Sequence, residues 1–433
     1  MSLRWRRRID LALFFAGIAL ALSGLHTLTD FDVTALDWWR YYVENVVRFG
    51  TWPLPYTTYM AAGPVLGFGF AVAGRYSMRF TSYGDARYAS RRDIAKFGLR
   101  ASTGMVLGQA GKSKLITSAV RHVMVAAGAR SGKTQGIVIP TLFTFKGAAI
   151  VIDAKGELWD ATAGYRSKFS DCYRLEWTSE NTARYNMISL SVLPDAPAEI
   201  ERRMAQISSV LVARDADRNE SYFDKDAQRL LNVLLLTEVF DARHEGRDAE
   251  IVNVAHWCSE FAPETLETAR EENLTALTVK LAEAAERAAE RGYPRTVGND
   301  LTAFSEMNPR QRDGVVGTLE ADLKSFKSGA VQTALSGCDF TARSLVEGAR
   351  PGTVYVVVQS EDREFVSPMT TALITNVVYS LISRPLKEAA ASHPMLLLLE
   401  EFSSLKKTAA IPEAYDRGAG LGIQIMTVIQ AFL

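Results

Sequence analysis

The segment Ala127-Gly128-Ala129-Arg130-Ser131-Gly132-Lys133-Thr134 has the composition and spacing of a phosphate-binding loop. In such a loop a glycine lets the backbone approach the phosphates, and successive N–H groups hold the anion together with the next helix N-terminus. Lys133 would place its charge on the β- and γ-phosphates, and the Thr134 hydroxyl would ligate magnesium. The pattern predicts a site for ATP and Mg2+, formed by Ala127, Gly128, Ala129, Arg130, Ser131, Gly132, Lys133, Thr134 and Gln135.

The sequence around this loop supports the same interpretation. The β-type run His122–Ala126 precedes it and the apolar stretch Ile137–Phe143 follows it, which is the order strand, loop, helix. Ala127 replaces the usual first glycine, a sterically mild change. Upstream, Gly111-Lys112-Ser113 imitates the motif, but no clear β run precedes it, so we interpret that segment as a loop.

A second chemical feature is the pair Glu400-Glu401, which ends the apolar run Met395–Leu399. A continuous apolar run is typical of a strand buried on both faces. We expect Glu400 to hold magnesium, directly or through water, and Glu401 to orient and polarise the attacking water. The alternative is a solvent-exposed acidic strand end. Aspartate is usual at the first position; because Mg2+ geometry is demanding, Glu400 predicts slowed hydrolysis.

Two further residues are candidates for sensing or stabilising the γ-phosphate. The apolar run Gly420–Ile429 ends in Gln430, whose amide would contact the γ-phosphate; a structural hydrogen bond is the alternative. Arg417 is expected in the loop before this run. Ring-forming motors often use such an arginine to reach a neighbour's phosphate, and a solvated arginine is the alternative.

The elements that must position these residues alternate between strands and helices. Further β runs are expected at Ala148–Asp153, Cys172–Trp177 and Thr353–Gln359. This alternation predicts an α/β fold with a mostly parallel sheet and ligands at the carboxyl ends of its strands. Between Leu193 and Val346 the periodicity is helical, for example in Asp226–Phe240 and Leu274–Arg291, with few strand-like runs.

The N-terminal part predicts a membrane anchor. A basic start, Arg4–Arg8, precedes the apolar run Leu11–Leu25, and a second uncharged run covers Thr51–Gly74. Basic clusters flank the pair while acidic residues outnumber basic ones near His26–Gly50, so the positive-inside rule places both ends in the cytoplasm. The alternatives are a cleaved signal peptide plus one span, or two buried core helices.

The composition limits which binding partners and which metal sites are expected. Lys and Arg number 49 and so do Asp and Glu, so bulk charge gives no attraction to nucleic acid, and DNA contact requires a local patch or an assembled pore. Cys172, Cys258 and Cys338 are far apart, and the five histidines are scattered. The spacing predicts buried structural thiols in a reducing compartment and no metal site built from Cys and His.

Several short segments together resemble the TraG-like coupling ATPases of type IV secretion and conjugation. They are spread along most of the chain, and their combination is more specific than any one of them. Arg184-Tyr185-Asn186 resembles an Arg-Tyr-Asn-Pro element, with Met187 in place of proline. The other matching segments are Gly84–Ala89, Ala129–Lys133 with Ile139–Leu142, and Asp153–Glu157 with Thr162–Arg166.

The resemblance implies an inner-membrane, RecA-like P-loop NTPase at the base of a secretion channel, with its soluble domains in the cytoplasm and a homohexameric ring. It would recruit a relaxosome or secreted effectors and use ATP to move single-stranded DNA or protein. The implied organisation is a two-helix transmembrane anchor with a short periplasmic loop (1–80), an NTPase domain in two parts (81–192 and 347–433) and an inserted all-α domain (193–346).

The chain given stops at Leu433, directly after the run that carries Gln430, where the family normally continues. We therefore expect a C-terminally shortened NTPase domain. One alternative function is a nucleotide-binding membrane receptor or scaffold with little turnover. Another is a membrane-anchored DNA-partitioning motor, against which Asp153–Glu157 and Arg184–Asn186 argue.

Overall fold

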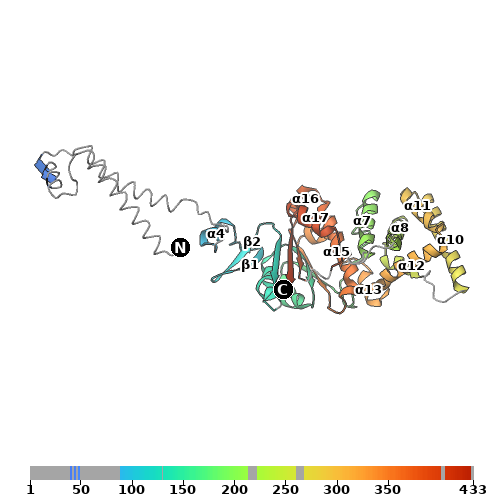
Figure 1. Ribbon diagram of the computed structural model, residues 1–433, viewed down its shortest axis with the longest axis horizontal. Helices are drawn as coiled ribbons and strands as arrows, with labels where there is room; N and C mark the ends of the chain where they lie inside the picture. Colours follow the sequence, from blue (N-terminus) through green and yellow to red (C-terminus); the bar gives the residue numbers. More distant parts are fainter. Residues whose placement is uncertain are drawn as a thin grey trace. The chain divides into compact units, whose positions relative to one another are not determined.

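The computed structural model describes residues 88–433, except 129, 213–221, 260–267, 401–404 and 431–433, together with five residues between 40 and 48. The chain divides into two compact units, Met1–Ala89 and Ser90–Leu433 (Figure 1). The two apolar runs expected to span a membrane, Leu11–Leu25 and Thr51–Gly74, lie outside the described residues. The second unit contains all the elements discussed below.

A six-stranded sheet forms the centre of the second unit, and all its pairings are parallel. Its strand order is β3-β8-β7-β4-β6-β5, so consecutive strands are joined by crossovers and their carboxyl ends share one edge (Figure 1). The strands are β3 (Val123–Ala127), β4 (Ala148–Asp153), β5 (Asp171–Leu175), β6 (Gly352–Val357), β7 (Met395–Leu399) and β8 (Ile423–Gln430).

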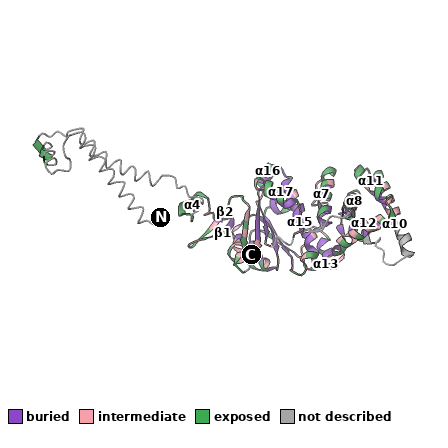
Figure 2. Ribbon diagram, in the orientation of Figure 1, coloured by how far each residue is buried: buried purple, intermediate pink, exposed green. Residues whose placement is uncertain are grey.

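Three of the four inner strands, β4, β6 and β7, are buried at every residue (Figure 2). Successive side chains of a strand point to opposite faces: in β4, Ile150 and Ile152 belong to one core cluster, whereas Ala149 and Val151 belong to the other. Both faces are therefore covered, which explains why these strands read as unbroken apolar runs.

Helices cover the two faces of the sheet. The helix after the P-loop and α6 pack on one face, and α15 and α17 on the other. The elements are α4 (Arg91–Lys96), the π-helical turn η1 (Thr134–Val138), α5 (Ile139–Thr144), α6 (Glu157–Arg166), α15 (Arg363–Ile382), α16 (Leu386–Ala391), α17 (Ala410–Arg417) and the 3-10 turn η4 (Gly418–Leu421). An antiparallel hairpin, β1 (Met105–Ala110) and β2 (Ser113–Thr117), precedes β3.

All the elements described between β5 and β6 are helical. Their first helix, α7, packs against both α8 and the core helix α15. Many of their apolar side chains belong to the core cluster on the face of the sheet that α15 and α17 cover. The elements are α7 (Pro197–Leu211), α8 (Tyr222–Glu245), α9 (Ile251–Ser259), α10 (Thr268–Glu290), α11 (Arg295–Ser305), α12 (Pro309–Leu323), the 3-10 turn η2 (Lys324–Lys327), α13 (Gly329–Leu335) and α14 (Ala342–Glu347). We call this stretch the helical segment.

The element Arg184-Tyr185-Asn186 joins the sheet to the helical segment. Arg184 forms an ion pair with Asp339 at 2.7 Å. The fully buried Tyr185 hydroxyl accepts a hydrogen bond from Asn376 Nδ2 at 3.1 Å, and the Asn186 amide donates to a backbone carbonyl of the helical segment. These residues are committed to contacts within the fold, so their role here is to fix the junction.

One helix of the described part, α15, is long and apolar enough to cross a membrane. However, 78% of its most apolar stretch is buried inside the protein, where it packs against α7, α14 and α17. A helix covered by protein on its apolar sides is a core helix. The two spans expected near the N-terminus remain predictions.

Candidate nucleotide-binding site

The predicted phosphate loop follows β3 directly and leads into η1, at the carboxyl edge of the sheet. Gly132 has a φ of 80°, a left-handed conformation that disfavours residues with a Cβ. The Gly136 N–H donates to the Gly132 carbonyl at 2.7 Å, so the helical turns begin immediately after the loop. The sequence order strand, loop, helix is confirmed, and Gly132 is required by its backbone conformation.

Lys133 already lies over the loop. Its Nζ donates to the backbone carbonyls of Ala127 and Gly128, both at 2.8 Å. The ammonium is thus held at the mouth of the loop by two neutral acceptors. A phosphate group can replace them, because charge-assisted hydrogen bonds are stronger than bonds to neutral carbonyls.

Thr134 and Glu400, the two predicted magnesium ligands, are brought together from 266 positions apart in the sequence. The Thr134 hydroxyl donates to Glu400 Oε1 at 2.5 Å. A hydroxyl and a carboxylate oxygen are ligands that Mg2+ accepts, and this ion is usually held by one or two carboxylates plus phosphates and water. No group of three or more His, Cys, Asp or Glu residues gathers in the described part of the chain, so a cage of protein ligands is not available there.

One further sequence candidate at this edge, Gln430, is placed by the backbone. Strand β8 lies between β3 and β7, and its register sets Gln430 opposite Ala127 at the start of the P-loop. The position of Gln430 therefore suits contact with a bound phosphate group. Glu401 lies outside the described residues, and its role remains a prediction.

Arg417 is placed differently from our expectation. It is the last residue of α17 rather than part of a loop, because the helix continues to the turn η4 that leads into β8. It lies six positions before Ile423, the first residue of β8, which places it near the amino edge of the sheet, whereas the P-loop of its own chain lies at the carboxyl edge. Its side chain is 62% exposed and forms an ion pair with Glu413 at 3.4 Å.

Asp153, at the carboxyl end of β4, is buried and serves the helix that follows it. Its carboxylate accepts hydrogen bonds from the N–H groups of Trp159 at 2.9 Å and Lys155 at 3.4 Å. Burial raises the pKa of Asp153, and these backbone donors partly offset that rise. Gly156, with a φ of 78°, makes the turn between strand and helix. This carboxylate therefore caps α6.

The hairpin contributes a wall that sequence reasoning missed. A pocket of about 440 Å3 lies between β1, β2 and the P-loop, lined by Gln109 and Lys114 on one side and by Ser131, Gly132 and Lys133 on the other. This volume is in the usual range for small-molecule sites. Gln109 and Lys114 are cross-strand partners. The loop expected at Gly111-Lys112-Ser113 is confirmed only for Gly111 and Lys112, which form the hairpin turn. The expectation that no β run precedes it was wrong, because β1 ends at Ala110 and Ser113 begins β2. No signal in the sequence showed that the hairpin folds against the P-loop.

A family model described as type IV secretory system conjugative DNA transfer matches residues 87–432. A conjugal transfer protein TraG from Escherichia coli is 26% identical over 380 residues, covering 80% of this chain and 57% of that protein. Protein VirD4 from Agrobacterium fabrum is 28% identical over 314 residues, covering 72% of this chain and 43% of that protein. The chain thus spans about half the length of these relatives.

Solved structures give the same fold. The plasmid coupling protein TrwB in complex with ADP and Mg2+ superposes with a TM-score of 0.53 at 16% identity, covering 80% of this chain and 71% of that one. TrwB with a non-hydrolysable ATP analogue gives a TM-score of 0.54 at 14% identity, covering 80% and 72%. At such identities the likeness concerns the fold, and it confirms the predicted RecA-like α/β core.

Proposed function

This chain belongs to the type IV secretory system conjugative DNA transfer family, and on that premise we propose that it is a coupling ATPase. It binds ATP with Mg2+ and uses hydrolysis to drive DNA–protein or effector substrates into a type IV secretion channel. Relatives described as conjugal transfer and coupling proteins, and a TrwB structure holding ADP and Mg2+, support this role.

The observation that carries the proposal is the hydrogen bond between Thr134 and Glu400. It joins the end of the P-loop to the tip of β7, so a hydroxyl and a carboxylate converge beside the charged Lys133. This convergence of oxygen ligands and a fixed positive charge is what a Mg2+–triphosphate complex requires. When bound, Mg2+ would neutralise developing charge on the β- and γ-phosphates.

Each residue then has a defined task. Lys133 exchanges its bonds to the Ala127 and Gly128 carbonyls for bonds to phosphate oxygens. Glu401 orients and polarises the attacking water, and Gln430 contacts the γ-phosphate. Arg417, being far from its own P-loop, reaches the nucleotide of a neighbouring copy in a homohexameric ring.

The cellular setting is part of the same proposal. Two N-terminal transmembrane helices anchor the chain in the bacterial inner membrane, with the NTPase core and the helical segment in the cytoplasm. The helical segment recruits a relaxosome or effector proteins, and single-stranded DNA passes through the ring. The apolar runs Leu11–Leu25 and Thr51–Gly74 support the anchor.

The proposal is tested by the ATPase rate of the full-length protein, with and without single-stranded DNA, measured alongside its oligomer size. We expect hydrolysis that DNA accelerates. Lys133→Ala should lower the rate by at least about a hundredfold, as expected when a main electrostatic stabiliser of the transition state is removed. Lys112→Ala, which changes the exposed lysine of the hairpin turn, is the matched control. Equal rates in the two variants would refute the P-loop assignment.

A further inference from the structure

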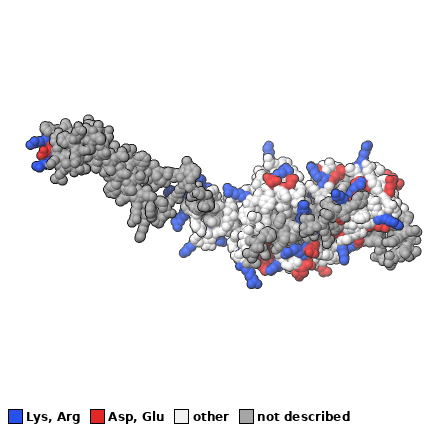
Figure 3. Space-filling view, in the orientation of Figure 1, with Lys and Arg blue, Asp and Glu red and all other residues white. Residues whose placement is uncertain are grey.

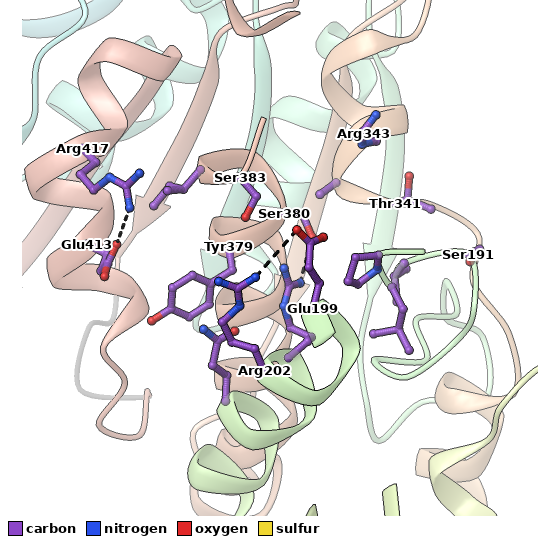
Figure 4. A pocket seen from close by; sticks show the side chains of 17 residues that line it. Ser191, Glu199, Arg202, Thr341, Arg343, Tyr379, Ser380, Ser383, Glu413 and Arg417 are labelled. Atoms are coloured by element: carbon purple, nitrogen blue, oxygen red, sulfur yellow. Dashed lines mark hydrogen bonds and ion pairs between the residues drawn. The ribbon is translucent and has the colours of Figure 1, made fainter. Parts of the chain in front are cut away.

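A second pocket, of about 450 Å3, lies where the helical segment meets the core (Figure 4). Its walls come from α7 and α14 of the helical segment and from α15 and α17 of the core. Because α14 immediately precedes β6 and α17 precedes β8, these walls lie at the amino edge of the sheet. The P-loop is at the carboxyl edge, so the two pockets are separate within one chain.

Positive charge dominates this pocket. The charged side chains that line it are those of Arg202, Arg203, Arg343, Arg417, Glu199 and Glu413. Four arginines and two glutamates thus line the pocket, which gives an excess of two positive charges in a space enclosed on several sides by protein. Concave sites lined by one sign of charge concentrate ligands of the opposite sign.

Arg203 is the buried member of the group. Its exposed fraction is 6%, and its Nη1 donates to the Asn376 carbonyl and the Ser380 hydroxyl, both at 3.0 Å, and to the Asn376 side-chain oxygen. The guanidinium also lies 5.9 Å from the centre of the Tyr379 ring. None of the ion pairs in the described part of the chain includes Arg203. Burial of a guanidinium without a carboxylate partner is costly, so an anion in the pocket would compensate this charge.

The exposed arginines are held only weakly. Arg202 lies 3.8 Å from Glu199 one helical turn earlier, with both side chains more than half exposed. Arg417 pairs with Glu413 at 3.4 Å within α17, with side chains that are 62% and 42% exposed. Exposed pairs of this kind contribute about 0–1 kcal/mol, so a multivalent anion can displace the glutamates. Arg343 is also exposed, and no ion pair of the described residues includes it.

We propose that this pocket binds a small phosphate-bearing anion, such as a triphosphate group, and thereby links the helical segment to the core. Guanidinium groups match phosphate oxygens in a bidentate geometry, and the pocket volume is that of a small-molecule site. Arg202 and Arg343 belong to the helical segment and Arg417 to the core, so one bound anion would join the two parts. The anion is either free in solution or the triphosphate on the P-loop of a neighbouring copy; the second source rests on the proposed function.

The first experiment isolates the pocket from the P-loop. Inorganic triphosphate is titrated by calorimetry into the full-length Lys133→Ala protein, and we expect one bound anion per chain. Adding Arg202→Gln and Arg343→Gln should weaken binding at least tenfold, whereas Arg310→Gln should not, since Arg310 is exposed but lies outside the pocket. No binding by Lys133→Ala, or equal affinity in the double variant and the Arg310→Gln control, overturns the proposal.

A second experiment distinguishes the two sources. The Lys133→Ala protein is mixed with protein carrying only Arg202→Gln and Arg343→Gln, and ATP hydrolysis is measured. If the neighbour's nucleotide is the ligand, each pure sample is slow and the mixture exceeds the sum of its parts. If a free anion is the ligand, the mixture equals that sum. The calorimetric result needs no hydrolysis, so failure of the proposed ATPase function is recognised separately, as inactivity of the unmodified chain.

Discussion

Glu400 and Thr134 meet at a distance that leaves little room between them. The direct hydrogen bond is 2.5 Å long, whereas Mg2+ between two oxygens requires about 2.0–2.1 Å to each. The longer side chain of glutamate reaches the threonine fully, so one of the two groups must retreat when the ion is bound. The expectation of slowed hydrolysis therefore rests on the departure from aspartate and the demanding geometry of Mg2+, not on this distance.

We predict that Glu400→Asp raises kcat for ATP hydrolysis while the KM for ATP changes little. The shorter side chain opens the space in which the ion is held and leaves the P-loop unchanged. Steady-state kinetics with saturating Mg2+ measure both constants. Glu388→Asp, at an exposed position of α16, controls for a general effect of the substitution. A large gain would also identify the natural chain as a slowed motor or a scaffold; a drop in kcat would mean that the glutamate is well placed.

A buried arginine holds the C-terminal end of the helix after the P-loop. Arg166 in α6 is fully buried and donates to the carbonyls of Leu142 at 2.9 Å, Phe145 at 2.7 Å and Gly147 at 2.8 Å. A cation is favourable at the C-terminal end of a helix, here α5. Burial nevertheless lowers the pKa of Arg166.

Arg166→Met should lower the free energy of unfolding by about 3 kcal/mol, because it leaves several buried carbonyls without donors. Urea denaturation of the purified protein measures the loss. Lys168→Met, two residues further on and exposed, should change stability by no more than about 0.5 kcal/mol. A small effect at Arg166 would show that the P-loop helix does not depend on this anchor.

The ends of the secondary-structure elements were predicted best for the most buried strands. The runs Ala148–Asp153 and Met395–Leu399 were predicted with the ends that the strands have, because strands buried on both faces are apolar throughout. The edge strand β5 begins and ends earlier than the predicted run Cys172–Trp177, since pairing with β6 decides its ends. The helix predicted after the P-loop begins with the π-helical η1, in which the Ile139 N–H donates to the Thr134 carbonyl; the next residue, Pro140, has no N–H to donate.

The sequence predicted those site residues that belong to a recognisable motif. Lys133, Thr134 and Glu400 followed from motifs, and the structure brings them together. The wall formed by Gln109 and Lys114 did not follow, because only the tertiary fold sets the hairpin against the P-loop. The position of Arg417 at the end of α17 did not follow from the sequence either, because it depends on the path of the chain between β7 and β8.

At the scale of the whole molecule, charge is balanced. The chain has 49 basic and 49 acidic residues, and on the face shown in Figure 3 both signs are interspersed over the described residues. Such a surface exerts little long-range attraction on DNA. Any binding of a single strand then rests on local phosphate contacts, which are sensitive to salt.

We predict that stimulation of ATPase activity by single-stranded DNA falls steeply between about 50 and 200 mM salt, because each phosphate contact made in the complex contributes about −0.7 to the slope of log K against log salt concentration. The DNA concentration that gives half-maximal stimulation, measured at four salt concentrations, yields this slope. The rate without DNA, followed over the same range, serves as the reference. A half-maximal concentration independent of salt would exclude phosphate contacts as the main source of binding.

The insertion of β8 between β3 and β7 has a consequence for biosynthesis. Strand β3, which leads into the P-loop, lies at the edge of the sheet, and its one described neighbour is β8. The His122 ring accepts a hydrogen bond from the backbone of Ile425, 303 positions later. A nascent chain therefore exposes an unpaired P-loop strand until Ile425, 303 positions after His122, has left the ribosome, and pairings between such distant segments form slowly. Folding intermediates that lack β8 would offer this edge to other chains, so the yield of assembled protein should depend on how quickly translation delivers β8.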